Sequence, residues 1–232
     1  MNNLIGMATG SIHSWKNSLD EQITILKKLN VGCIELTFGT FPELDRKISE
    51  ENLSYLRNLK YVSMHAPYMK NLSPYYYTTR REIEKVESVY NMIHADTVVF
   101  HPNLLRIKLD TFMNICMENL PDFCDVSVEK KHKLVLDTAH ALSYGPGKIE
   151  ELIGKYDIQH VHLSDRRYSE FRKKVRDHQQ MLFCQEIHKF EAVRKLSCPI
   201  LIEISTKDRK NDIANLVNEV EFVRALFSQV VN

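Results

Sequence analysis

The chain has 232 residues, of which 44% are hydrophobic and 26% charged, and its formal net charge is +1. This near-neutral balance gives no global argument for binding nucleic acid or an acidic membrane. No apolar run approaches the roughly 18 residues needed to cross a bilayer, and the first residues lack the basic flank of a signal peptide. The five cysteines are odd in number and form no Cys-x-x-Cys pair, which predicts free thiols in a reducing compartment. We therefore expect a cytoplasmic protein with no membrane association.

Short apolar, β-prone runs alternate with helical patterns along the chain. The first helix is expected to begin at Ser18, with Glu21 completing a capping box, and the later helices to span residues 49–59, 78–94, 148–155, 183–196 and 211–230. The expected strands are residues 4–8, 31–36, 61–64, 97–100, 114–117, 134–136, 158–163 and 198–204. Alternation of this kind predicts a parallel sheet, and eight strands fit a closed barrel better than an open sheet. We predict a single α/β barrel domain over residues 1–232, with shortened helical connections after the fourth and fifth strands.

One segment shows how a strand of such a barrel places polar side chains at its carboxyl end. The apolar run 134–136 ends in Asp137, and His140 follows three residues later. The carboxyl ends of buried parallel strands are where α/β barrels place their chemistry. The alternative interpretation is that Asp137 caps a loop and His140 is an ordinary surface histidine.

The same design recurs at the other strand ends. Each residue involved is a His, Asp or Glu, the nitrogen and oxygen donors that a hard or borderline cation takes. Gathering so many ionisable groups in one cavity costs several kcal/mol each unless a cation or mutual pairing compensates. The sequence therefore predicts a metal centre at the barrel mouth. Its candidate ligands are His65, His101, Glu118, Asp137, His140, His162, Asp177, His178 and Glu203.

These strand ends resemble the xylose isomerase-like TIM barrel superfamily, and most closely its endonuclease IV branch (apurinic/apyrimidinic endonuclease family 2). The matching segments keep the same order from the third strand to the last. They are residues 65–72 (HAPYMKNL), 98–102 (VVFHP), 117–121 (MENLP), 136–141 (LDTAHA), 162–165 (HLSD), 177–178 (DH) and 201–204 (LIEI). The ordered set is fairly specific for the superfamily and less specific for the branch.

The resemblance implies a site for up to three Zn²⁺ ions. His65 and His101 would hold one ion, and Glu118 would bridge it to a second ion completed by Asp137, His162 and Glu203. The third ion would be held by His140 and His178 with Asp177. The implied reaction is cleavage of a phosphodiester next to an abasic site in DNA by metal-hydroxide attack, in which Glu118 is the catalytic residue.

Further residues match or suit substrate binding. Tyr68 and Met69 match the family positions that enter duplex DNA beside an abasic nucleotide. The alternative interpretation is that Tyr68 packs against the barrel rim. The expected loop 166–176 is the one clear basic segment, and it includes Arg166, Arg167 and Arg172. Guanidinium groups beside a metal site suit a phosphate-bearing partner, either damaged DNA or a phosphorylated sugar. A solvated loop without a partner is the alternative. No oligomeric state follows from the sequence.

The chain also departs from the nuclease branch. Its middle is short, a glycine-rich segment of the family is replaced by residues 179–184, and Asp177 and His178 are adjacent where the family separates them by one residue. Without the third ion, the site would resemble those of the sugar isomerases and epimerases of the superfamily. These enzymes use one Mn²⁺ or Mg²⁺ on the equivalents of Glu118, Asp137, His162 and Glu203. A sugar or sugar-phosphate isomerase is therefore the alternative function.

Overall fold

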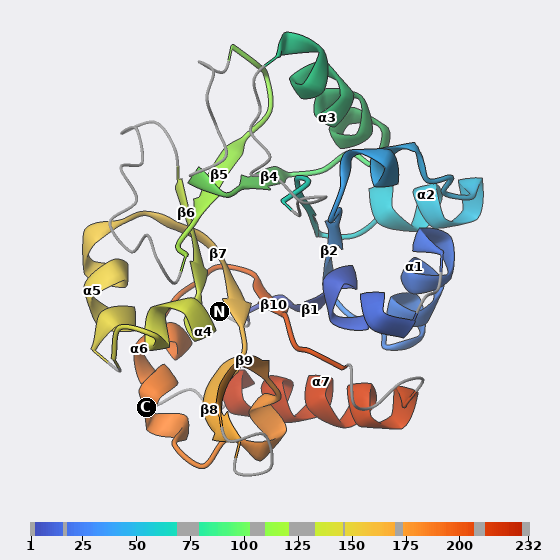
Figure 1. The fold of residues 1–232 in the computed structure, drawn as a ribbon. Helices are drawn as coiled ribbons and strands as arrows, with labels where there is room; N and C mark the ends of the chain where they lie inside the picture. The colour runs from blue at the N-terminus through green and yellow to red at the C-terminus, as the bar shows by residue number, and fades with distance from the viewer. Residues whose placement is uncertain are drawn as a thin grey trace.

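A computed structural model describes residues 3–15, 18–68, 79–102, 110–120, 133–145, 147–169, 174–206 and 212–228. Eight parallel strands close into a barrel in the order β1-β10-β7-β6-β5-β4-β3-β2, with helices outside the ring (Figure 1). The strands are β1 (Ile5–Ala8), β2 (Cys33–Thr37), β3 (Tyr61–His65), β4 (Thr97–Phe100), β5 (Ile115–Glu118), β6 (Lys133–Asp137), β7 (Ile158–Leu163) and β10 (Ile200–Ile202). The predicted closed α/β barrel is confirmed. The predicted short connections after β4 and β5 lie largely outside the described residues.

The helices that cover the barrel begin where the sequence provides caps. Ser18 and Glu21 form the predicted capping box of the first helix, and Thr79 and Glu82 form a second one. Each satisfies backbone N–H groups that a helix start leaves without partners. The helices are α1 (Leu19–Lys28), α2 (Glu50–Arg57), α3 (Arg80–Met92), α4 (Thr138–Leu142), α5 (Lys148–Lys155), α6 (Glu191–Arg194) and α7 (Ile213–Ser228). Short 3₁₀ segments are η1 (Thr9–Trp15), η2 (Phe41–Asp45), η4 (Met181–Phe183) and η5 (Ile187–Phe190).

Two local predictions were wrong. The segment expected as a basic loop contains an antiparallel pair, β8 (Asp165–Ser169) and β9 (Lys174–Gln179), in which Tyr168 lies opposite Val175. The helix expected over residues 183–196 is replaced by the short pieces η5 and α6. Because β8 follows β7 after a single residue, the hairpin stands directly on the barrel mouth.

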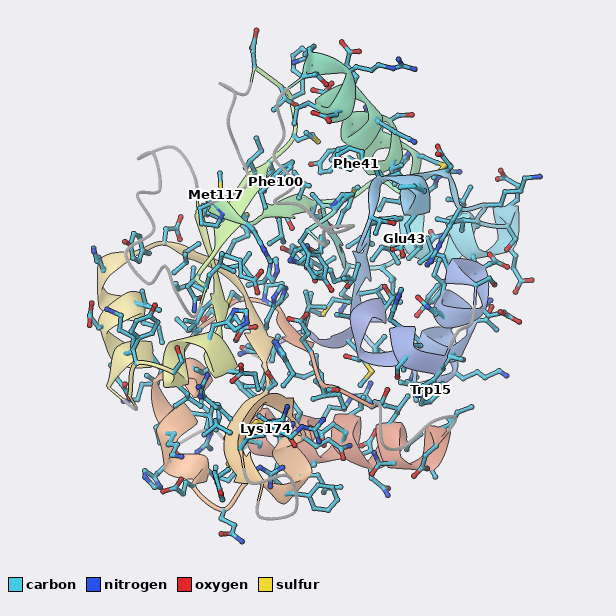
Figure 2. The ribbon with its side chains drawn as sticks, in the orientation of Figure 1. Trp15, Phe41, Glu43, Phe100, Met117 and Lys174 are labelled. Carbon is cyan, nitrogen blue, oxygen red and sulfur yellow. The ribbon has the colours of Figure 1, made fainter. Side chains whose placement is uncertain are left out.

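Side chains point into the ring of strands (Figure 2), and the described interior residues are buried, so the barrel interior is a packed core. Strand residues alternate between the interior and the helices. Apolar interior positions form two small clusters, one of Cys33, Tyr61 and Leu201 and one of Val99, Cys116 and Val135. The larger core lies between the ring and its helices. Within the described part of the chain, every helix is too short or too polar to span a bilayer.

Candidate metal centre

The barrel mouth is a cavity of about 490 Å³ at the carboxyl ends of the strands. It is lined by ligand-type side chains at its floor, including His65, Glu118 and Glu203, and by small polar residues such as Ser205 and Thr206 at its wall. Strand alternation places these donors there. On β3, for example, Tyr61, Ser63 and His65 share the interior face at successive depths. A volume of this size accommodates a small organic ligand or a single nucleotide.

The first ligand group consists of His65, His101 and Glu118, whose ligand atoms lie within 4.8 Å of one another. Both histidines place Nε2 near the same carboxylate oxygen, Oε2 of Glu118, at 3.0 Å for His65 and 2.9 Å for His101. The other ring nitrogen of His65 lies 2.9 Å from the backbone carbonyl oxygen of Ala66. A carbonyl only accepts, so Nδ1 donates its hydrogen to it, and Nε2 is the nitrogen on which a metal ion can replace the hydrogen that faces Glu118.

The second group joins Glu118 to Asp137, His162 and Glu203, one from each of four strand ends. Nδ1 of His162 lies 3.2 Å from Oε1 of Glu118 and 3.0 Å from Oε2 of Glu203. Glu118 therefore turns one oxygen to the first group and the other to the second. A carboxylate in this position can bridge two cations, as the resemblance implied.

The third group consists of Asp137, His140 and His178. His140 donates through Nδ1 to the carbonyl oxygen of Asn119 at 2.9 Å, which leaves its Nε2 as the atom with a free lone pair. The structure differs here from the expectation for Asp177, whose carboxylate lies 2.6 Å from Arg166 and is absent from the group. Asp177 and His178 are consecutive in β9, and consecutive strand residues point to opposite faces, so Asp137 takes the expected place of Asp177.

The donor set fits metal ions by a direct structural criterion. Oδ1 of Asp137 caps α4 by accepting from the backbone N–H of His140 at 2.7 Å. Its Oδ2 is buried and has no hydrogen-bond partner among the described residues. A buried carboxylate oxygen without a partner is costly in a protein interior, and a bound cation removes that cost. All three groups contain only imidazole nitrogens and carboxylate oxygens, which suit Zn²⁺ and similar ions.

The pKa shifts of the side chains at the mouth show how strongly their charges interact. Burial favours the neutral form of Glu118, yet hydrogen bonds from His101, His162 and His65 hold the pKa of this carboxyl well below its usual range. Burial opposes charge on His65 as well, but its bond to Glu118 raises the pKa of the imidazole to about 9. For Asp137 burial prevails, and its pKa is raised even though His140 opposes the change. The metal-free site therefore holds protons at positions that cations would occupy.

The described substrate-binding candidates are held by neighbouring protein groups. The Tyr68 ring lies against His65 and His101, with ring centroids 4.9 and 5.2 Å away, and it lines the cavity. Arg166 pairs with Asp177. Arg167 pairs with Asp165 at 2.9 Å and also donates to the backbone carbonyl of Phe183. The ion pairs of Arg166 and Arg167 lie within the hairpin, and the bond of Arg167 to Phe183 joins the hairpin to η4. Met69 and Arg172, the remaining candidates, lie outside the described residues.

Sequence reasoning missed one acidic residue inside the barrel. Glu35 is fully buried on β2 and forms a further group of possible ligands with His160 and His162, below the mouth. His160 is fully buried beside it. The signal for Glu35 was a single carboxylate inside the apolar run CIELT of residues 33–37. A charged residue in a strand with both faces buried requires a partner, so a carboxylate in such a strand predicts a pairing group elsewhere in the barrel interior.

Comparisons with known proteins bear on the fold. No family model and no curated protein matches the chain. Among solved structures, endonuclease IV from Thermus thermophilus superposes with a TM-score of 0.61 at 14% identity, over 98% of this chain and 100% of that one. A probable 3-DHS dehydratase involved in petrobactin synthesis from Bacillus anthracis gives 0.62 at 13% identity, over 95% and 98%. The 3-keto-D-glucoside 4-epimerase of E. coli gives 0.55 at 10%, over 96% and 99%.

The chain thus has the closed α/β barrel fold of these three enzymes, which catalyse different types of reaction. At these identities the likeness concerns the fold alone. The reaction must be argued from the residues at the mouth.

Proposed function

We propose that the protein is a metal-dependent phosphodiesterase that cleaves DNA beside an abasic site. The observation that carries the proposal is the sharing of ligands among three adjacent groups, which Glu118 and Asp137 link into one array. Two- and three-metal arrays of this kind suit the in-line displacement of an oxygen at phosphorus, because the cations together neutralise the attacking and leaving oxygens. An isomerase site needs only the four ligands of the second group.

The residues of the chain would divide the work as follows. His65 and His101 with Glu118 would hold one Zn²⁺, Glu118, Asp137, His162 and Glu203 a second, and Asp137, His140 and His178 a third. When bound, the ions would supply Lewis-acid stabilisation of the phosphoryl oxygens. Tyr68 lines the cavity and would contact the nucleotide next to the missing base. The net charge of the chain is only +1, so DNA binding would depend on local groups at the mouth and hairpin.

A duplex carrying one synthetic abasic site tests the proposal directly. Incubation with zinc-loaded protein is expected to produce a strand break at that site, and prior treatment with a chelator is expected to prevent it. An intact duplex of the same sequence is the control for contaminating nucleases. Failure of fully metal-loaded protein to cut the abasic strand would contradict the proposal.

A sugar or sugar-phosphate isomerase or epimerase is the second candidate. One observation favours it: Glu118, Asp137, His162 and Glu203 already form a complete four-ligand group for one Mn²⁺ or Mg²⁺. Such an enzyme exchanges a carbon-bound proton with solvent during turnover. Incubating ketose sugars and their phosphates with Mn²⁺-loaded protein in deuterated water, and following deuterium incorporation by NMR, would detect this activity. Incorporation without DNA cleavage would select the isomerase.

A further inference from the structure

A chain of hydrogen bonds crosses the barrel interior just below the metal groups. It contains Glu35 on β2, Ser63 and Tyr61 on β3, Thr97 on β4 and His160 on β7, and we call these five residues the inner relay. All five are buried. In the ring of strands β7 lies across the barrel from β3, so the inner relay spans the interior, and its members Glu35 and His160 contact His162.

The direction of each bond follows from the number of hydrogens available. The Glu35 carboxylate only accepts, so Ser63 donates its single hydroxyl hydrogen to Oε2 at 2.8 Å. Ser63 must then accept from Thr97, at 3.1 Å, which uses the only hydrogen of Thr97. The bond of 2.9 Å between Thr97 and Tyr61 is therefore donated by the Tyr61 hydroxyl.

The same count fixes the ring hydrogen of His160. Because Tyr61 has already donated its hydrogen to Thr97, its contact of 2.8 Å with Nδ1 of His160 must be donated by the imidazole. A phenol oxygen accepts more than one hydrogen bond, so the contact of Gln159 with the same hydroxyl does not alter this direction. The Nε2 atoms of His160 and His162 face each other at 3.3 Å, and the hydrogen between them belongs to His162, because Oε2 of Glu35 lies 3.0 Å from Nε2 of His162 and 3.5 Å from Nε2 of His160. The Nε2 atom of His160 is then an acceptor.

Two acceptors consequently face one atom of His162. Its Nε2 lies 3.0 Å from Oε2 of Glu35 and 3.3 Å from Nε2 of His160. A hydrogen on Nε2 of His162 satisfies both neighbours, whereas a lone pair there would face two further lone pairs. The hydrogen on Nε2 points toward the inner relay. The other ring nitrogen of His162, Nδ1, faces Glu118 and Glu203 at the mouth.

We infer that the inner relay is a positioning device that fixes the tautomer of His162, keeping hydrogen on Nε2 so that Nδ1 is the atom presented to a metal ion in the second group. Glu35, Tyr61 and Thr97 are positioning residues in this scheme and touch neither ion nor substrate. The inference rests on the metal site of the proposed function. It does not depend on which reaction that site performs, since the second group serves both candidates.

The test uses the full chain labelled with ¹⁵N and loaded with ¹¹³Cd²⁺, and it measures nitrogen–cadmium coupling. In the wild type, coupling is expected at Nδ1 of His162, with a slowly exchanging hydrogen on Nε2. Tyr61→Phe and Thr97→Val each interrupt the relay and are expected to lower Cd²⁺ affinity of the second group by about 10- to 100-fold, as loss of a group that orients a metal ligand does. Hydrogen exchange at Nε2 of His162 is expected to accelerate in both variants.

Cys116→Ala is the matched control, because Cys116 is equally buried inside the barrel but is not part of the relay. It is expected to lower stability while leaving the coupling and the affinity unchanged. Glu35→Gln keeps an accepting oxygen and is expected to retain more affinity than Glu35→Leu. If Glu35→Leu fails to fold, Tyr61→Phe and Thr97→Val still decide the question.

Three results would overturn the inference. They are coupling through Nε2 of His162, a Cd²⁺ ion held between Glu35, His160 and His162, or equal affinity in Tyr61→Phe and Cys116→Ala. All of these measurements are made without substrate. Absence of DNA cleavage would therefore refute the proposed reaction and leave the tautomer result standing.

Discussion

The barrel interior contains two polar layers, one above the other, that differ in how their hydrogens are distributed. In the inner relay each hydroxyl hydrogen has an acceptor, and the chain of donors runs in one direction to Glu35. At the mouth, by contrast, carboxylate oxygens and imidazole nitrogens crowd together, and Oδ2 of Asp137 has no hydrogen-bond partner among the described residues. The relay pairs three hydroxyl groups with one carboxylate, and Oε1 of Glu35 is its one carboxylate oxygen without a partner among the described residues. The mouth instead gathers three carboxylates and the imidazoles of the metal groups, an excess of acceptors that bound cations offset. The comparison teaches that two buried polar layers of one core differ in their supply of hydrogens.

Glu118→Gln is the change expected to cause the largest loss of metal binding and cleavage at the mouth. The substitution removes the charge that both the first and the second group share, so at least two ions lose a ligand. We expect loss of cleavage by a factor on the order of 1,000 or more, together with loss of bound metal. Cleavage of the abasic duplex and metal content by mass spectrometry would be measured together.

Glu219→Gln provides the control for this change. Glu219 is a fully buried carboxylate on α7 that accepts from the backbone N–H groups of Met181 and Leu182, away from the mouth. We expect lower stability with an unchanged metal content. Undiminished cleavage in Glu118→Gln would refute the bridging role.

Removal of His178 sharpens the comparison within the mouth layer. His178→Ala takes one of three ligands from the third group and none from the other two. We expect the affinity for one ion to fall about 100-fold while the other ions stay bound, because the second group keeps all four ligands. Stepwise chelator competition resolves the sites. A uniform loss of all ions would show that the groups are not separate.

The pH dependence of the metal-free protein should reveal the protons that replace cations. The pKa of His65 is raised to about 9 from the ordinary value near 6.5. Its contribution to stability is therefore fully present below about pH 6.5 and is lost as the pH rises through 9, on the order of 3 kcal/mol. The pKa values of Glu118 and Glu203 are lowered, so their contributions are lost on acidification instead.

Urea unfolding of chelator-stripped protein at several pH values measures this effect. We expect stability to decline from about pH 6.5 to 9, while metal affinity rises over the same range because ions compete with fewer protons. Stability that increases over this range would contradict the assigned pairing of His65 with Glu118.

The smallest expected effect concerns the hairpin. Arg166 pairs with Asp177 at a partly exposed position, and such pairs contribute up to about 1 kcal/mol. Arg166→Ala is expected to lower the free energy of unfolding by less than about 1 kcal/mol and to leave metal content unchanged. A large rise in KM for abasic DNA would instead show direct contact with the phosphate backbone.

The sequence was most informative where strand period and chemistry coincide. Buried parallel strands that end in His65, Glu118 or Asp137 indicated both the barrel and the place where donors meet, since closure of the ring brings strand ends together. The capping box at Ser18 was likewise readable from local residues alone. The strand ends and the capping box could be predicted because each depends on residues that are close together in the sequence.

The parts that escaped prediction depend on contacts between distant segments. Glu35 has its role through His160 and His162, which follow it by more than a hundred residues, and no local pattern shows that pairing. The hairpin was missed because its charges resemble a solvated loop, while Arg167 is in fact fixed by Asp165 and backbone carbonyls. Asp177 was assigned to the third group by the family resemblance, but Asp177 and His178 are adjacent in β9, and adjacent strand residues point apart.

A direct count and location of bound ions tests the central claim, that the strand ends form one shared array of metal ligands. Protein loaded with Zn²⁺, freed of excess ions and crystallised would be examined by elemental analysis and by anomalous diffraction at the zinc edge. The account predicts about three ions per chain, bridged by Glu118 and Asp137 at the barrel mouth. No ion at the mouth, with Glu118, Asp137, His162 and Glu203 unliganded in zinc-loaded crystals, would contradict it.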